Sequence, residues 1–125
     1  MNRMDRLNQL FKREIGRLIL MGDLSDPRLR LVTITYADVS KDLSVAHVGF
    51  SVMIDGEKAV EEARQGLMSA RGRIRSLLAS RIDIRHIPEI RFVHDGSIAE
   101  AMRMEETLEE IRQEREGKEH EEEPS

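Results

Sequence analysis

The sequence contains no cysteine, which excludes a disulfide framework and any metal site built from thiolates. Aromatic residues are also scarce: one tyrosine, three phenylalanines and no tryptophan are too few for a platform on which nucleic-acid bases stack. The longest apolar run, Leu18 to Met21, is far too short to cross a bilayer, and the charged N-terminus leads into no signal-peptide core. These absences predict a small reduced protein of the cytoplasm with no membrane partner.

Catalytic and cofactor motifs are absent as well. There is no phosphate-binding P-loop, no glycine-rich dinucleotide fingerprint and no serine–histidine–aspartate arrangement. The four histidines lack the spacing of metal ligands, and turn chemistry explains Asp38 and Asp42 better than a cation site does. We therefore expect no metal and no cofactor. A small cofactor-free enzyme that uses His94 or His86 stays open as a hypothesis.

Charge is distributed unevenly along the 125 residues. From residue 105 to the end, ten glutamates face only Arg112, Arg115 and Lys118, which gives this stretch a net charge of −7. Residues 1–104 carry 17 basic and 14 acidic residues, a net charge of +3. The overall charge of −4 therefore averages a mildly basic body with a strongly acidic tail.

Hydrophobic periodicity predicts an α+β fold in a single domain. Apolar spacings of three and four indicate helices, and alternation of apolar and polar residues indicates strands. The expected elements, in order, are a helix at 3–21, strands at 31–37 and 46–52, a two-part helix at 57–82, a strand at 89–94 and a last helix from 97. Three strands with helices on one face make a small sandwich. In the first strand, Val32, Ile34 and Tyr36 are expected to face the core.

The C-terminal region is expected to fall outside this domain. Residues 1–97 form the predicted domain, and residues 98–113 form a C-terminal helix that includes the apolar Leu108 and Ile111. Residues 114–125 offer no hydrophobic side chain to bury and are rich in glutamate. They are therefore predicted to be a disordered acidic tail.

Two groups of residues are candidates for binding the phosphate backbone of a nucleic acid. At about 100° per residue, Arg6, Arg13 and Arg17 line up on a side of the first helix away from its apolar positions. The second group surrounds a small-residue step in the long helix and consists of Ala70, Arg71, Gly72, Arg73 and Arg75. Guanidinium groups beside an open backbone suit a phosphate chain. The alternative is a kinked core helix whose arginines are simply solvated.

The small-residue step also makes a prediction about the backbone. Glycine inside a helix costs about 1 kcal/mol relative to alanine, so its presence needs a reason. We expect Gly72 to hold a positive φ or to let a neighbour approach closely, and Ala70 to keep the step narrow. Two helical parts would then meet at a bend between residues 69 and 75.

The order helix, strand, strand, helix, helix, strand resembles the type II KH fold of nucleic-acid-binding proteins. That fold carries a GxxG loop between its middle helices, where this chain has Ala70-Arg71-Gly72. An Ala-x-Gly step followed by Ile74-Arg75 is similar to the bacterial ribosome-binding factor A family. Further stretches that resemble the family in order and spacing are Asp26-Pro27-Arg28-Leu29, Val32-Thr33-Ile34-Thr35, Ser40-Lys41-Asp42-Leu43 and Pro88-Glu89-Ile90-Arg91-Phe92. The resemblance covers about residues 3–111.

The resemblance implies a non-enzymatic factor that binds the free 30S small ribosomal subunit and its 16S rRNA. Such proteins assist late maturation of 16S rRNA near its 5′ end and are linked to cold adaptation, and we expect a monomer. A protein–protein adaptor that uses its hairpin face or acidic tail to bind a basic partner is the second hypothesis. Nothing functional carries over to residues 114–125, since C-termini vary within the family.

Overall fold

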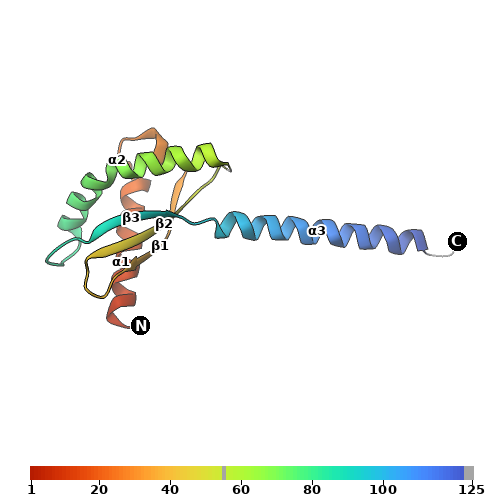
Figure 1. The fold of residues 1–125 in the computed structure, drawn as a ribbon, viewed down its shortest axis with the longest axis horizontal. Helices are drawn as coiled ribbons and strands as arrows, with labels where there is room; N and C mark the ends of the chain where they lie inside the picture. Colours follow the sequence, from red (N-terminus) through yellow and green to blue (C-terminus); the bar gives the residue numbers. More distant parts are fainter. Residues whose placement is uncertain (55, 123–125) are drawn as a thin grey trace. The chain divides into compact units, whose positions relative to one another are not determined.

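The computed structural model describes residues 1–54 and 56–122, with residues 98, 99 and 118–122 described by their backbone only. Its elements are, in order, α1 (Arg3–Leu20), the short 3-10 helix η1 (Pro27–Leu29), β1 (Val32–Val39), β2 (Val45–Val52), α2 (Glu57–Arg81), β3 (Glu89–His94) and α3 (Ser97–Glu122) (Figure 1). They divide between two compact units, Met1–Asp95 and Gly96–Ser125. The first unit is the predicted α+β sandwich, and the bounds of its third strand agree with the prediction.

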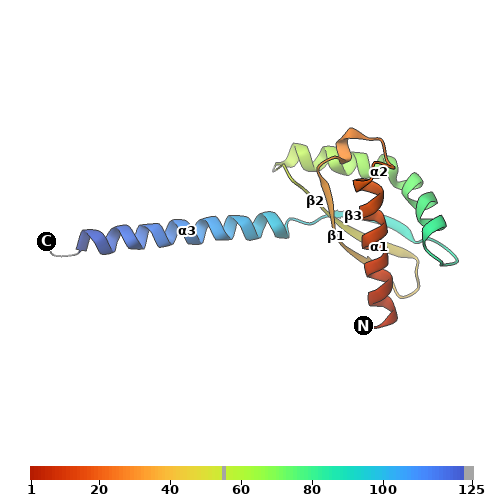
Figure 2. The ribbon, with the colours of Figure 1, turned by 180° about the vertical axis from the view of Figure 1, so that it is seen from behind.

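The sandwich contains a three-stranded sheet with the order β1-β2-β3. Strands β1 and β2 pair antiparallel as a hairpin, whereas β2 and β3 pair parallel, with Val48 opposite Phe92. A parallel neighbour cannot be reached by a tight turn, so the chain crosses over through α2 before it returns as β3 (Figures 1 and 2). The third strand therefore pairs with the second strand of the hairpin and not with the first.

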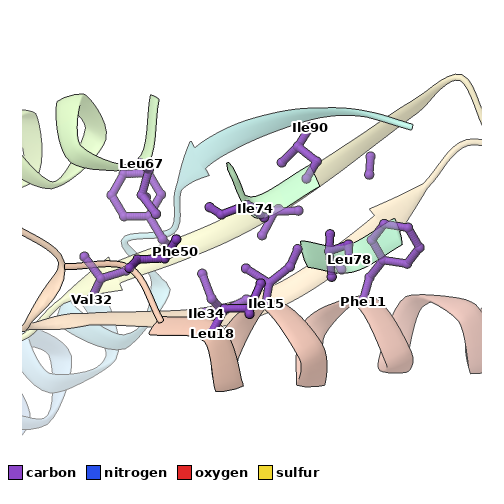
Figure 3. Close-up of a cluster of buried hydrophobic side chains, with 14 of the residues drawn as sticks. Phe11, Ile15, Leu18, Val32, Ile34, Phe50, Leu67, Ile74, Leu78 and Ile90 are labelled. Atoms are coloured by element: carbon purple, nitrogen blue, oxygen red, sulfur yellow. The ribbon is translucent and has the colours of Figure 1, made fainter. Parts of the chain in front are cut away.

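Helices α1 and α2 cover the same face of this sheet. Their apolar residues join one buried cluster with alternate residues of the strands (Figure 3). The largest fully buried side chains include Phe11, Ile15 and Leu18 of α1, Leu67, Ile74 and Leu78 of α2, and Val48, Phe50 and Ile90 of the sheet. Burying one such side chain contributes about 1.5–3 kcal/mol. The predicted placement of the helices on one face is therefore confirmed.

A β-bulge in β1 changes which residues of that strand face the core. The register between β1 and β2 shifts between Ile34 and Tyr36, so Thr35 is the extra residue. The shift reverses the alternation: Ile34 is buried before it, and Ala37 is buried after it. The prediction that Tyr36 faces the core was therefore wrong. Its ring lies on the open face of the sheet over Gly49, which has no room for a Cβ.

Helix α2 is one helix of 25 residues, and its ribbon bends about halfway along (Figures 1 and 2). The predicted bend is present, but the prediction of two separate helical parts was wrong, because helix continues through residues 69–75. The expectation that Gly72 holds a positive φ was wrong as well, and no other part of the described chain approaches it closely. Among the described glycines, positive φ occurs at Gly22 and Gly56, and a Cβ added to Gly72 would meet open space.

Close approach in α2 occurs at Gly66 instead. A Cβ added there would lie 3.0 Å from the Cβ of Arg28 and 3.1 Å from Cδ2 of Leu29, both in η1. The missing side chain therefore lets η1 lie against α2. This contact holds the connection between α1 and β1 beside the middle of α2.

The N-terminus of η1 is capped by Asp26. Its carboxylate accepts hydrogen bonds from the backbone N–H of Arg28 at 2.9 Å and from Nη2 of the same residue at 2.6 Å. Pro27 occupies the first helical position, where an N–H donor is not needed. The hydrogen bonds from the Arg28 side chain and backbone lower the pKa of Asp26 from its ordinary value of 3.8.

Helix α3 makes up the second unit from Ser97 to the end of the described residues and is longer than predicted. It runs from Ser97 to Glu122, past residue 113, where the predicted helix ended. The side chains described between 114 and 117 are exposed, and residues 123–125 of the predicted disordered tail lie outside the described residues. Across the described chain, no helix combines the length and apolar character needed to cross a membrane.

The two helical glycines of α2 are expected to respond differently to alanine. Gly72→Ala should raise the free energy of unfolding by about 0.5–1 kcal/mol, because alanine is the better helix former and its methyl group meets open space. Gly66→Ala should show no such increase in the free energy of unfolding, because its methyl group crowds Arg28 and Leu29. Urea unfolding of both variants beside the wild type measures the difference. A less stable Gly72→Ala variant would show that the bend depends on glycine.

The cap of η1 predicts a pH-dependent contribution to stability. Asp26→Asn should lower the melting temperature at pH 7, because asparagine cannot form the charged pair with Arg28. The folded-state pKa of Asp26 is depressed, so its contribution is present above the ordinary value of 3.8 and is lost as the pH falls through the lowered pKa. Melting curves of the two proteins should therefore converge in strong acid. A constant difference at every pH would contradict the assignment.

Candidate nucleic-acid interface

The first candidate group lies on the solvent side of α1, as predicted. Burial of Phe11 and Ile15 sets the rotation of this helix, and the side chains of Arg13 and Arg17 are 59% and 56% exposed. Arg6 is exposed as well, but it lies two helical turns before Arg13, or about 10 Å along the axis. The predicted stripe therefore has a close pair and a distant third member.

Glu14 lies beside this close pair and is the one charged residue that is buried in the described part of the chain. Its Oε1 lies 3.4 Å from Nε of Arg13 and 3.6 Å from Nη1 of Arg17. Its Oε2 lies 3.7 Å from Nη1 of Arg81, in the last turn of α2. One carboxylate thus joins arginines of two helices that are far apart in the sequence.

The loop after α1 brings a further arginine of α2 to the same place. Oδ2 of Asp23 lies 3.5 Å from Nη2 of Arg81. The backbone carbonyl of Asp23 accepts a hydrogen bond from Nε of Arg73 at 3.3 Å. Asp23 is therefore a partner of both Arg73, a predicted site residue, and Arg81. Glu14 is in turn a partner of Arg81 and of the two arginines of α1.

We call Arg13, Arg17, Arg73 and Arg81 the arginine cluster. Their four positive charges are opposed locally by two carboxylates, so the cluster keeps a net charge of +2. Guanidinium groups present several N–H donors in a planar fork that matches phosphate oxygens. The cluster can therefore bind the phosphates of a nucleic acid.

A shallow cavity of about 500 Å³ lies beside the cluster, between η1 and the middle of α2. It is lined by Leu24, Ser25, Asp26, Pro27, Ser69, Ala70 and Arg73. Nη2 of Arg28 also lies 3.4 Å from the Ser69 hydroxyl oxygen. The predicted residues Ala70 and Arg73 are thus brought together at the edge of a hollow that has polar groups on both sides.

The remaining predicted arginines lie elsewhere on α2. Positions two apart on a helix are separated by about 200°, so Arg71 and Arg75 lie on the side opposite Arg73. Arg71 is half-buried, and Nη2 of Arg75 donates a hydrogen bond to the Ile87 carbonyl at 3.0 Å. The structure therefore does not bring all of the predicted arginines to one surface. Gly72, between the two sides, is exposed.

Sequence reasoning missed three residues that organise the site: Glu14, Asp23 and Arg81. Arg81 lies eight residues after Arg73, which is about 80° further round an α-helix, so the sequence gave only a weak signal for it. Glu14 and Asp23 gave no comparable signal. Their partners in α2 follow them by 50 residues or more, and only the packing of α1 against α2 brings them together.

The described residues give little support to a catalytic or metal site. The His94 ring packs against Phe50 at the end of β3, with ring centroids 5.6 Å apart. His86 is exposed in the loop before that strand. Within residues 1–54 and 56–122, no group of three or more His, Cys, Asp or Glu side chains could hold a metal ion.

Comparison with known proteins identifies relatives along most of the chain. Residues 3–108 match the sequence model of the family described as ribosome-binding factor A. Ribosome-binding factor A of Shewanella sediminis (strain HAW-EB3) is 42% identical over 103 residues, which are 82% of this chain and 71% of that protein. The protein of the same name from Shewanella loihica is 40% identical over 82% of this chain and 73% of its own length.

Solved structures agree with these sequence relatives. The crystal structure of ribosome-binding factor A from Thermus thermophilus is 31% identical and has a TM-score of 0.64, covering 73% of this chain and 93% of that chain. A Thermus thermophilus homology model fitted into a cryo-EM map of a 30S complex has 28% identity and a TM-score of 0.52, over 70% of this chain and 93% of its own.

The ordered motifs, the α+β sandwich with its bent α2, and the relatives in sequence and structure all agree. The resemblance found in the sequence is thereby confirmed, and the chain belongs to the ribosome-binding factor A family.

Proposed function

We propose that this protein is a ribosome assembly factor that binds the free 30S subunit and assists late maturation of 16S rRNA at its 5′ end. It acts in the cytoplasm as a monomer, without enzymatic activity, and contributes to growth in the cold. The observation that carries the proposal is the family membership, together with a Thermus thermophilus relative fitted into a map of a 30S complex.

The arginine cluster supports a contact with rRNA phosphates. It presents exposed guanidiniums from two helices, and it carries a net positive charge in a basic body. Phosphate contacts fix the position of a protein on a nucleic acid without reading its sequence. Arg6, Ala70 and Gly72 extend the proposed RNA-binding surface beyond the cluster. Arg71 and Arg75 form a second proposed contact on the opposite side of α2.

Removing two cluster arginines should weaken 30S binding. We expect Arg13→Ala with Arg73→Ala to reduce co-sedimentation with 30S subunits and to flatten its salt dependence by about 0.7–0.9 per lost phosphate contact. Arg64→Ala with Arg91→Ala removes the same charge from residues outside the cluster and is the matched control. Arg71→Ala with Arg75→Ala should cause a smaller loss, because Arg75 already donates to the Ile87 carbonyl.

These measurements need a check on folding, so each variant is first compared with the wild type by thermal melting. A wild-type chain that does not co-sediment with 30S subunits would overturn the proposed function. Equal losses in the cluster pair and the control pair would instead mean that binding depends on net charge alone.

An adaptor function is the second candidate, and an apolar stripe on α3 favours it. Ala101, Met104, Leu108 and Ile111 follow one another at spacings of three, four and three, and the last three side chains are exposed. Residues 97–117 contain seven glutamates and three arginines, a net charge of −4. This charge repels RNA and a second copy of the helix. We infer that the stripe binds a basic, amphipathic protein segment on the subunit.

Glutamate substitutions in the apolar stripe should distinguish an adaptor function from 30S binding through RNA contacts alone. Met104→Glu with Leu108→Glu is expected to weaken co-sedimentation with 30S subunits by roughly tenfold, because two apolar contacts are lost. Met102→Glu with Gln113→Glu adds the same charge on the opposite side of α3 and should have little effect. Equal effects of the two double variants would exclude the stripe as a contact.

A further inference from the structure

Glu14 is an expensive residue to bury. Its side chain is only 9% exposed, and removing a carboxylate from water carries a penalty that its ion pairs have to offset. An apolar residue would fill the same edge of the α1 core face without that penalty. The core therefore gives no reason for a glutamate here, and the reason has to lie with the three arginines around it.

The distances indicate that Glu14 holds these arginines without using up their donors. They are 3.4, 3.6 and 3.7 Å, longer than direct charge-assisted hydrogen bonds. Two carboxylate oxygens cannot satisfy the N–H groups of three guanidiniums, each of which has five. Most of the donors on Arg13 and Arg17 thus remain available to a ligand from outside.

Holding a guanidinium in place before binding has a clear energetic effect. A free arginine side chain has many rotamers, and ordering it on a ligand costs free energy. A buried carboxylate beside the guanidinium restricts those rotamers before a ligand binds. Asp23 acts in the same direction on Arg81. The cluster is therefore expected to meet a phosphate with less loss of entropy than isolated surface arginines would.

We propose that Glu14 is a positioning residue: it orients Arg13, Arg17 and Arg81 toward successive phosphates of single-stranded or irregular RNA. The proposal rests on the proposed function, since it names the ligand chemistry of the same surface. The positioning role predicts a change in RNA affinity opposite to the usual effect of removing a negative charge. Removing a negative charge from an RNA-binding face normally strengthens binding, whereas removing this one weakens it.

The test compares Glu14→Gln with Glu57→Gln, which removes the same charge from an exposed residue in the first turn of α2. Dissociation constants are measured for 30S subunits and for a single-stranded RNA oligonucleotide over a salt series, well below the melting temperatures. We expect Glu14→Gln to bind roughly three- to tenfold more weakly than wild type, with a shallower salt slope. Glu57→Gln should bind as wild type does or slightly more tightly.

The outcomes distinguish failure of the positioning role from failure of the proposed function. Binding of a folded Glu14→Gln that equals or exceeds that of Glu57→Gln overturns the positioning role and leaves the proposed function intact. A wild-type chain that binds neither probe overturns both. If melting curves show that Glu14→Gln is unfolded, Glu14→Asp replaces it: the shorter side chain keeps the charge but moves the carboxylate away from the arginines. Wild-type affinity and salt slope in Glu14→Asp would then overturn the inference.

Discussion

The buried face of α1 is the constraint on which the candidate site depends. Phe11, Ile15 and Leu18 are completely buried against the sheet and α2, so α1 cannot rotate without exposing them. That fixed rotation leaves Glu14 at the edge of the core and directs Arg13 and Arg17 to solvent. The positions of the charged groups therefore follow from apolar packing, because the energy of burying three large side chains exceeds that of any exposed ion pair.

Helix α2 has two structural roles, and they place different steric requirements on its small residues. Its apolar side covers the sheet and supplies the crossover that the parallel pairing of β2 and β3 requires. Gly66 is where the helix meets η1, whereas Gly72 lies in open space. The glycine that looks functional in the sequence is thus not the one that packing requires. A Cβ added at Gly72 would meet open space, which leaves room for the proposed approach of a phosphate backbone.

Charge divides this molecule into parts with different chemistry. The first unit carries the arginine cluster, and the described helix of the second unit is acidic with an exposed apolar stripe. RNA is attracted by the first and repelled by the second, whereas a basic protein segment would respond in the opposite way. A ribosomal subunit offers both kinds of surface. The two candidate functions can therefore describe two contacts of one factor on one particle.

Local patterns in the chain were sufficient to predict the order of the elements, the bounds of β3, the α+β class and the family, because apolar periodicity and ordered motifs are properties of neighbouring residues. Long-range packing determined the features that depend on distant residues. The bulge at Thr35 turned Tyr36 outward, since register is set between strands. The partner of β3, the contact at Gly66 and the pairing of Glu14 with Arg81 likewise required the packed fold, because each joins segments that no local pattern relates.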